Sequence, residues 1–282
     1  GIFMELASKL KQLREKGEGA HMPHVYYGDP SLEFSMRLIS TLSENGADIL
    51  EFGIPFSDPT ADGPTFIAAC ERALENDVTP TKCIEAIRKL KSRGLELPIV
   101  VTSYYNILYV AGVGRFLRRL RDAGAEAIIV PNLPIEEAET LLYEAEKTGI
   151  HAILQVTPTT TGERLKKICE ASSGFIYVIN VQGVTGVRDT LSQSTIELIE
   201  RVRSHTDTPI LAGFGISKPA HARSVIEAGA DGAIAGSVYT RIYERNLKNP
   251  EQALPEISKL ASQIKQACRE GFENRGRVSP GS

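Results

Sequence analysis

The sequence predicts a (β/α)8 TIM barrel. Short apolar runs of strand length alternate along the 282 residues with stretches that carry apolar side chains at helical spacing. Three helical stretches end in Gly-Ala just before the next apolar run, at 46–47, 124–125 and 229–230. Glycine there supplies the left-handed C-cap that turns the chain back. An open doubly wound sheet is the alternative, but no Gly-x-Gly-x-x-Gly follows the first strand.

The elements follow in a regular order. We expect strands over 20–26, 48–52, 98–102, 126–130, 151–156, 175–179, 209–212 and 231–235. An extra amphipathic helix over about 4–16 would close the bottom of the barrel, with Leu6, Leu10 and Leu13 on one face. The last helix is expected over about 251–269. We therefore predict one barrel domain over 4–269 and a disordered tail over 270–282.

Composition narrows the class of protein. The net charge of −3 offers no basic surface for nucleic acid or anionic lipid, and the apolar runs are too short to span a membrane. The N-terminus turns charged by Glu5 and Lys9, so we see no secretory signal. The scattered cysteines at 70, 83, 169 and 268 predict free thiols and a cytoplasmic location.

Two carboxylates stand out after the second strand. Glu51 ends a buried run, and Asp62 follows in a loop punctuated by glycine and proline, within the stretch LEFGIPFSDPTADGP at 50–64. A carboxylate at the end of a buried strand is costly to desolvate, which favours a catalytic role. Barrel active sites lie at that end of the strands. The structural alternatives are a salt bridge for Glu51 and loop ordering for Asp62.

Glycine-rich turns end the sixth, seventh and eighth strands. They are Gly183–Gly186, Gly213–Ser217 and Ala235–Ser237, and the last two lead into helices. Glycine lets the backbone approach an anion, and free helix N–H groups bind it. A single such turn is more often only a tight connection. Two at the seventh and eighth strands predict a phosphorylated small substrate.

The stretch 50–64 closely resembles the signature of the tryptophan synthase alpha subunit family. The resemblance covers roughly 4–268, and further family segments match in order at 104–106, 157–160, 183–186 and 213–217. It implies a carbon–carbon lyase that splits indole-3-glycerol phosphate into indole and glyceraldehyde 3-phosphate by a retro-aldol reaction. It also implies no cofactor and no metal, and a separate beta subunit, itself dependent on pyridoxal phosphate, as partner.

The resemblance also assigns roles to single residues. Glu51 would be the general acid–base, and Asp62 would hold the indole N–H and stabilise its positive charge. Tyr177 would line the site near the glyceryl chain, and Thr185 would help orient Asp62. Phe214 would contact substrate, and the phosphate cradle would be Gly186, Gly213, Gly215, Gly236 and Ser237. The turn at Asp29-Pro30 and the loop around Asp58 match segments at the partner interface.

Several positions depart from the family pattern. Alternation places His24 and Tyr26 on the interior face, where His24 would wall the indole pocket. Thr102 and Gln155 replace apolar residues, and Phe66 is bulkier than usual. Either these polar groups hydrogen-bond one another, or they serve a different ligand in a divergent or engineered pocket that runs other chemistry. His24 is either a satisfied core histidine or a base paired with Glu51 or Tyr26.

Two further expectations concern alternatives. His21 points to the face opposite His24, which disfavours a metal site, and His151, His205 and His221 are expected at the surface or at element ends. A non-catalytic activator of the beta subunit is a third possible function. The intact pair Glu51 and Asp62 argues against it.

Overall fold

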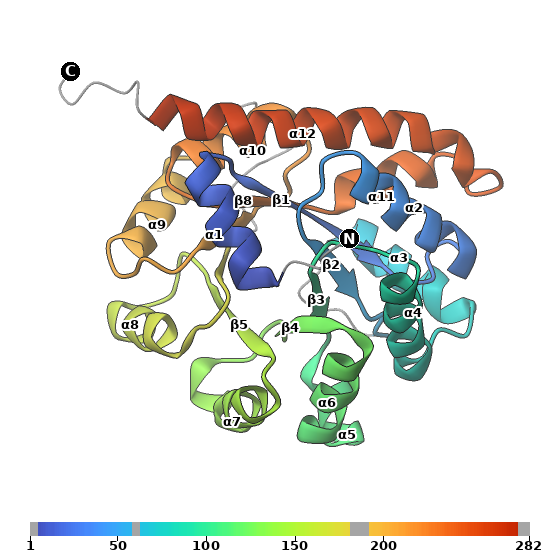
Figure 1. Ribbon diagram of the computed structural model, residues 1–282, viewed down its shortest axis with the longest axis horizontal. Coiled ribbons are helices and arrows are strands. Elements are labelled where there is room, and N and C mark those ends of the chain that lie inside the picture. Colours follow the sequence, from blue (N-terminus) through green and yellow to red (C-terminus); the bar gives the residue numbers. More distant parts are fainter. Residues whose placement is uncertain (1–4, 58–62, 181–191, 276–282) are drawn as a thin grey trace.

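A computed structural model describes residues 5–57, 63–180 and 192–275. In this part of the chain, eight parallel strands close into a barrel in chain order (Figure 1). They are β1 (Ala20–Tyr26), β2 (Leu50–Gly53), β3 (Ile99–Thr102), β4 (Ala125–Ile129), β5 (His151–Val156), β6 (Ile176–Ile179), β7 (Ile210–Gly213) and β8 (Gly232–Ala235). Each predicted strand is present, with bounds within two residues of those expected. The predicted TIM barrel is confirmed.

The helices connect the strands and form the outer layer. They are α1 (Leu6–Lys16), α2 (Leu32–Glu44), α3 (Pro64–Glu75), α4 (Pro80–Ser92), α5 (Tyr105–Ala111), α6 (Val113–Ala123), α7 (Glu139–Thr148), α8 (Gly162–Ala171), α9 (Gln193–Arg203), α10 (Pro219–Glu227), α11 (Ser237–Glu244) and α12 (Leu254–Asn274), with short 3-10 helices η1 (Ile135–Glu137) and η2 (Pro250–Ala253). Within these residues, no helix is both long and apolar enough to cross a bilayer.

Strand alternation separates two apolar layers. Inward-facing residues such as Met22, Ile49 and Phe175 form one buried cluster inside the barrel. The outward-facing residues form a larger cluster beneath the helices. The same alternation turns the side chain of Glu51, two residues after Ile49, into the barrel.

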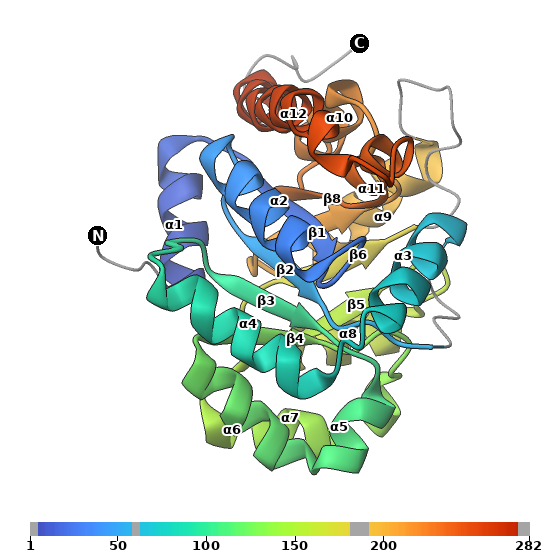
Figure 2. The ribbon, with the colours of Figure 1, turned by 90° about the vertical axis from the view of Figure 1, so that its right-hand side faces the viewer.

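Helix α1 closes the bottom of the barrel, as predicted. Its Leu6, Leu10 and Leu13 are buried in the interior cluster. Figure 2 shows α1 at the end where the strands begin and α3 at the end to which they point. All the strands are parallel, so their C-terminal ends lie together at the α3 end of the barrel. We call this end the mouth, because barrel active sites lie there.

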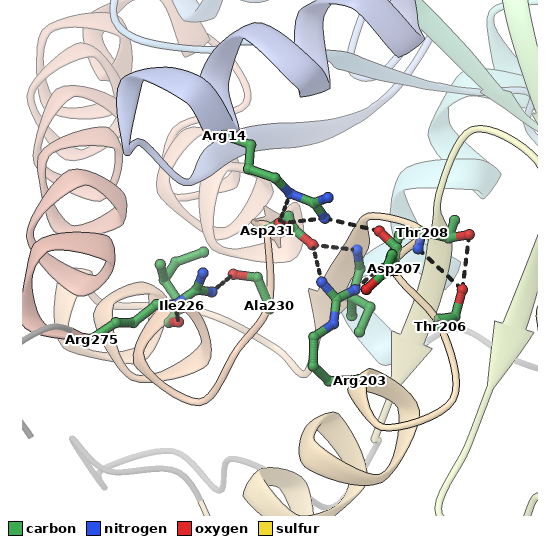
Figure 3. A network of polar contacts seen from close by, with 10 residues as sticks. Arg14, Arg203, Thr206, Asp207, Thr208, Ile226, Ala230, Asp231 and Arg275 are labelled. Carbon is green, nitrogen blue, oxygen red and sulfur yellow. Dashed lines mark hydrogen bonds and ion pairs between the residues drawn. The ribbon is translucent and has the colours of Figure 1, made fainter. Parts of the chain in front are cut away.

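Charged side chains fasten α1 to the barrel. Asp231, just before β8, accepts hydrogen bonds from Arg14 Nε of α1 and from Arg203 Nη1 of α9, each at 3.2 Å (Figure 3). Its Oδ2 also accepts the backbone N–H of Ile210 at 2.9 Å. This carboxylate joins three elements at the end of the barrel away from the mouth.

The last helix is longer than predicted. Helix α12 runs to Asn274, whereas the sequence pattern placed its end at 269. Glycine disfavours helix, and Gly271 lies in this extension. In α12 it is buried against α10, where a Cβ atom would lie 2.6 Å from the Arg223 carbonyl oxygen. Arg275 Nε then donates to the Ile226 carbonyl of α10. Packing against α10 therefore keeps this segment helical.

Candidate active site at the mouth of the barrel

A cavity of about 320 Å³ opens at the C-terminal ends of the strands. It lies between the strand ends of β1, β6, β7 and β8 and the first turns of α3 and α11. Eight residues that the sequence assigned to substrate or phosphate line it: His24, Phe66, Tyr177, Gly213, Phe214, Gly215, Gly236 and Ser237. The structure therefore brings together residues that lie far apart in the sequence.

One side of the cavity is suited to an anion. Helix α11 begins at Ser237 directly after Gly236, so its first backbone N–H groups lie at the cavity. The N-terminus of a helix carries partial positive charge and unsatisfied donors. Gly215 has φ +71°, a conformation that favours glycine, and the space beside its Cα is open.

Sequence reasoning missed one cation at this side. Arg241 lines the cavity from α11, and its Nη1 donates to Ser237 Oγ at 3.2 Å. The spacing of four residues between Ser237 and Arg241 places both on one face of a helix. That spacing could have identified Arg241 from the sequence.

Glu51 is buried at the edge of this site. The residue is 1% exposed, and Thr102 Oγ1 donates to its Oε2 at 2.5 Å. His24 stands in register with Glu51 on the neighbouring strand, with Nδ1 3.3 Å from the same oxygen. Among the described residues, His24 lines the cavity and Glu51 lies against His24.

His24 is an uncharged member of an aromatic cluster. Its ring lies 4.8 Å from the rings of both Tyr26 and Phe66, which are 5.0 Å from each other. Burial lowers the pKa of His24 from 6.5 to about 3. The imidazole is therefore neutral near pH 7, and its contact with Glu51 is not an ion pair at that pH.

The remaining polar substitutions also face the interior. Thr102 is 4% exposed and donates a hydrogen bond to Glu51. Of the two explanations considered for the polar substitutions, mutual hydrogen bonding or a different ligand, this bond fits the first. Gln155 on β5 is half-buried and pairs in register with Tyr177 on β6. Asp62, Thr185 and Gly186 lie outside the described residues, as does Asp58.

The histidines away from the site lie at element ends, as predicted. They are His151 at the start of β5, His205 just after α9, and His221 in the first turn of α10, where it is fully buried. Its Nδ1 accepts the backbone N–H of Ser217 at 3.2 Å, so it orders the end of the turn at 213–217. One histidine on a helix gives no sequence signal for such a bond. In the described segments, no group of three or more His, Cys, Asp or Glu side chains could hold a metal.

Comparison with known proteins decides the family. A sequence profile described as tryptophan synthase alpha chain matches residues 10–269. The chain belongs to the tryptophan synthase alpha chain family. The resemblance inferred from the motifs is confirmed.

The relatives cover nearly the whole chain. The tryptophan synthase alpha chain of Methanocaldococcus jannaschii is 44% identical over 255 residues, which are 90% of this chain and 90% of the relative. That of Methanoregula boonei is 42% identical over 256 residues, 91% of this chain and 96% of the relative.

Solved structures of the family have the same architecture. The alpha chain from Legionella pneumophila superposes with a TM-score of 0.85 at 27% identity, over 98% of this chain and all of that one. The aminoacrylate-bound tryptophan synthase of Mycobacterium tuberculosis gives a TM-score of 0.82 at 30% identity, over 93% of this chain and 98% of that one. The alpha subunit of tryptophan synthase cleaves indole-3-glycerol phosphate, so the predicted lyase function is confirmed.

Proposed function

We propose that this chain cleaves indole-3-glycerol phosphate at the barrel mouth, with Glu51 as the acid–base and the turns at 213–215 and 236–237 as the phosphate site. The observation that carries the proposal is the burial of Glu51 against His24, which lines a cavity with an anion-binding side. A buried carboxylate beside a phosphate cradle is the constellation that this reaction requires.

Bond polarity defines the work of the site. Indole C3 is a poor leaving carbanion, so C3 must first gain a proton and give an indolenine. Its C=N⁺ then accepts the electron pair of the breaking carbon–carbon bond, while the glyceryl hydroxyl loses its proton and becomes an aldehyde. Indole C3 therefore gains one proton, and the glyceryl hydroxyl loses one. A single carboxyl group that donates and then accepts a proton can serve both steps.

The other residues take supporting roles in this proposal. Asp62 holds the indole N–H and offsets the charge that develops on the ring, and Thr185 orients Asp62. Tyr177 and Phe214 contact the substrate, beside Phe66 and His24, and Gln155 contributes to the interior wall next to Tyr177.

In this proposal the phosphate binds at the turns that follow β7 and β8. Gly186, Gly213, Gly215, Gly236 and Ser237 supply the cradle, and Arg241 adds a positive charge beside Ser237. Binding the phosphate at a fixed point orients the reacting carbon, and ideal orientation can lower a reaction barrier by about 7–11 kcal/mol.

We further propose a tryptophan synthase beta subunit as partner, in the cytoplasm. Tyr109 and Val110 on α5 are 71% and 78% exposed, which leaves large apolar side chains in solvent on a helix that follows β3 at the mouth. The turn at Asp29-Pro30 follows β1 at the same end. The beta subunit carries its own pyridoxal phosphate, and this chain needs none. The four cysteines form no disulfide, which suits a reducing compartment.

The test is release of indole from indole-3-glycerol phosphate, with and without a beta subunit. We expect Glu51→Gln to abolish release, and Glu126→Gln to retain it. Glu126 is the matched control, because it also lies on a strand but accepts the Leu6 N–H at the bottom of the barrel. Normal activation of the beta subunit without any release by the parent chain would instead indicate a non-catalytic activator. Undiminished release by Glu51→Gln would refute the proposed role.

A further inference from the structure

The carboxylate of Glu51 is contacted from both neighbouring strands. Thr102 Oγ1 of β3 donates to its Oε2 at 2.5 Å, and Nδ1 of His24 on β1 lies 3.3 Å from the same oxygen. We propose that His24 is a positioning residue, whose neutral imidazole carries its proton on Nδ1 and donates it to Glu51, fixing the carboxyl group for proton transfer. This inference rests on the proposed acid–base role of Glu51.

The surroundings of the two ring nitrogens favour this tautomer. A neutral imidazole has one N–H donor and one acceptor nitrogen. A bare Nδ1 would direct its lone pair at the oxygen of a carboxylate, whereas an Nδ1–H is attracted to it. Nε2 is buried and has no hydrogen-bond partner within the described residues. A proton on Nε2 would therefore be a buried donor without an acceptor, at a cost of about 1–3 kcal/mol.

The ring has little freedom to turn away. Tyr26 and Phe66 pack on it at 4.8 Å. A Cβ atom at Gly53 would lie 2.9 Å from Nε2, and one at Gly236 would lie 2.9 Å from the Cβ of His24. The imidazole thus occupies a slot between two glycines and two aromatic rings. A ring fixed in this way can hold a carboxyl group in one orientation.

The arrangement predicts which kinetic constant depends on His24. Proton transfer requires the carboxyl group within a fraction of an ångström of its acceptor, and a misplacement of about 1 Å costs about a hundredfold in rate. Substrate affinity depends mainly on the phosphate side of the cavity, which does not include Nδ1. Loss of the donor should therefore lower kcat and leave KM almost unchanged.

The test compares two isosteric variants. His24→Asn keeps an N–H donor close to the position of Nδ1, and His24→Leu has the same size without a donor. We expect His24→Leu to lower kcat by about ten- to a hundredfold with KM within about twofold, and His24→Asn to recover most of the loss. Thermal unfolding of both variants shows whether the comparison is between folded proteins. Equal kcat in the two variants would overturn the inference.

A spectroscopic measurement tests the tautomer in the parent chain itself. ¹⁵N NMR of the parent chain distinguishes a protonated from a bare ring nitrogen, and His24→Asn identifies the signals. We expect Nδ1–H and a bare Nε2 near pH 7, and loss of that preference in Glu51→Ala. The opposite tautomer in the parent chain would overturn the inference even if His24→Leu did not fold. If Glu51→Gln stayed active, the proposed function would fail instead, whatever the tautomer.

Discussion

His24 and Glu51 lie side by side in register on the first two strands, with Nδ1 of the imidazole 3.3 Å from Oε2 of the carboxyl group. The resemblance inferred from the sequence leads one to expect an aromatic or aliphatic side chain where this chain has His24. The imidazole is therefore not isolated in the core, since it contacts the carboxyl group that we propose as the acid–base. Thr102 completes the arrangement from the third strand.

Thr102 offers the most direct test of this arrangement. Thr102→Val removes the hydroxyl but keeps the shape, and we expect kcat to fall about tenfold or more, because a hydrogen bond to a charged group contributes about 1.5–3 kcal/mol. Thr102→Ser keeps the hydroxyl and should retain most of the activity. Steady-state indole release measures both. Parent-like kcat in Thr102→Val would mean that the bond at 2.5 Å does not matter for turnover.

Much of the fold could be predicted because its signals are local. Apolar alternation identified every strand, and the glycines at 46, 124 and 229 all adopt the positive φ expected of C-caps. The end of α12 could not be predicted in this way. Gly271 is helical only because α10 lies against it, which is a contact between segments almost fifty residues apart.

The site was predicted in part for the same reason. Residues after the strand ends could be assigned to the mouth from topology alone, as for Gly213 and Ser237. The bond between Thr102 and Glu51 and the closeness of His24 depend on strand register and side-chain rotamers, which periodicity does not determine. Alternation indicated only that these side chains share one interior.

Gly236 should not tolerate a side chain. In Gly236→Ala, the new Cβ would lie 2.5 Å from Phe66 Cζ and 2.9 Å from His24 Cβ. Phe66 can shift, but the Cβ of His24 is fixed by its strand, so the cavity must deform. We expect kcat/KM to fall and the free energy of unfolding to drop by about 1–3 kcal/mol.

Two variants control this prediction. Gly162→Ala at the start of α8 has open space around the new Cβ, and it should be close to the parent in both measurements. Adding Phe66→Leu to Gly236→Ala should recover part of the stability. No recovery would mean that the clash with His24, rather than Phe66, dominates.

Arg241 should contribute to substrate binding and not to the chemical steps. We expect Arg241→Ala to raise KM about fivefold at unchanged kcat, which corresponds to about 1 kcal/mol for an exposed charge. Arg241→Lys keeps the positive charge, so its KM should lie between those of the parent and Arg241→Ala. Arg245→Ala is the matched control, because Arg245 lies one turn further and pairs with Glu256 outside the cavity. Equal KM values for the two alanine variants would contradict the role of Arg241.

Asp231 should matter for stability alone. Asp231→Ala leaves Arg14 and Arg203 without their shared carboxylate and the Ile210 N–H without its acceptor. We expect the free energy of unfolding in denaturant to fall by about 3 kcal/mol, with unchanged kcat in the folded fraction. Glu256→Ala, which breaks the exposed pair with Arg245, should cost less than about 1 kcal/mol. A large loss of kcat in Asp231→Ala would show that the bottom of the barrel is coupled to the mouth.

The buried histidine should make stability depend on pH. Burial lowers the pKa of His24 in the folded chain to about 3, whereas an unfolded histidine keeps about 6.5. At pH 7.5 both states are neutral at this position. At pH 5 the unfolded state binds a proton that the folded state does not, which lowers the free energy of unfolding by about 2 kcal/mol.

His24→Asn removes this contribution because asparagine does not titrate. Between pH 7.5 and 5, the variant should therefore lose about 2 kcal/mol less stability than the parent chain, as measured by denaturant unfolding at both pH values. His21, whose pKa burial also lowers to about 3, is retained in both proteins and cancels from the difference. His205→Asn alters an exposed histidine and should behave like the parent. The same loss in His24→Asn and the parent would mean that His24 is protonated in the folded chain, in which case its contact with Glu51 would be an ion pair.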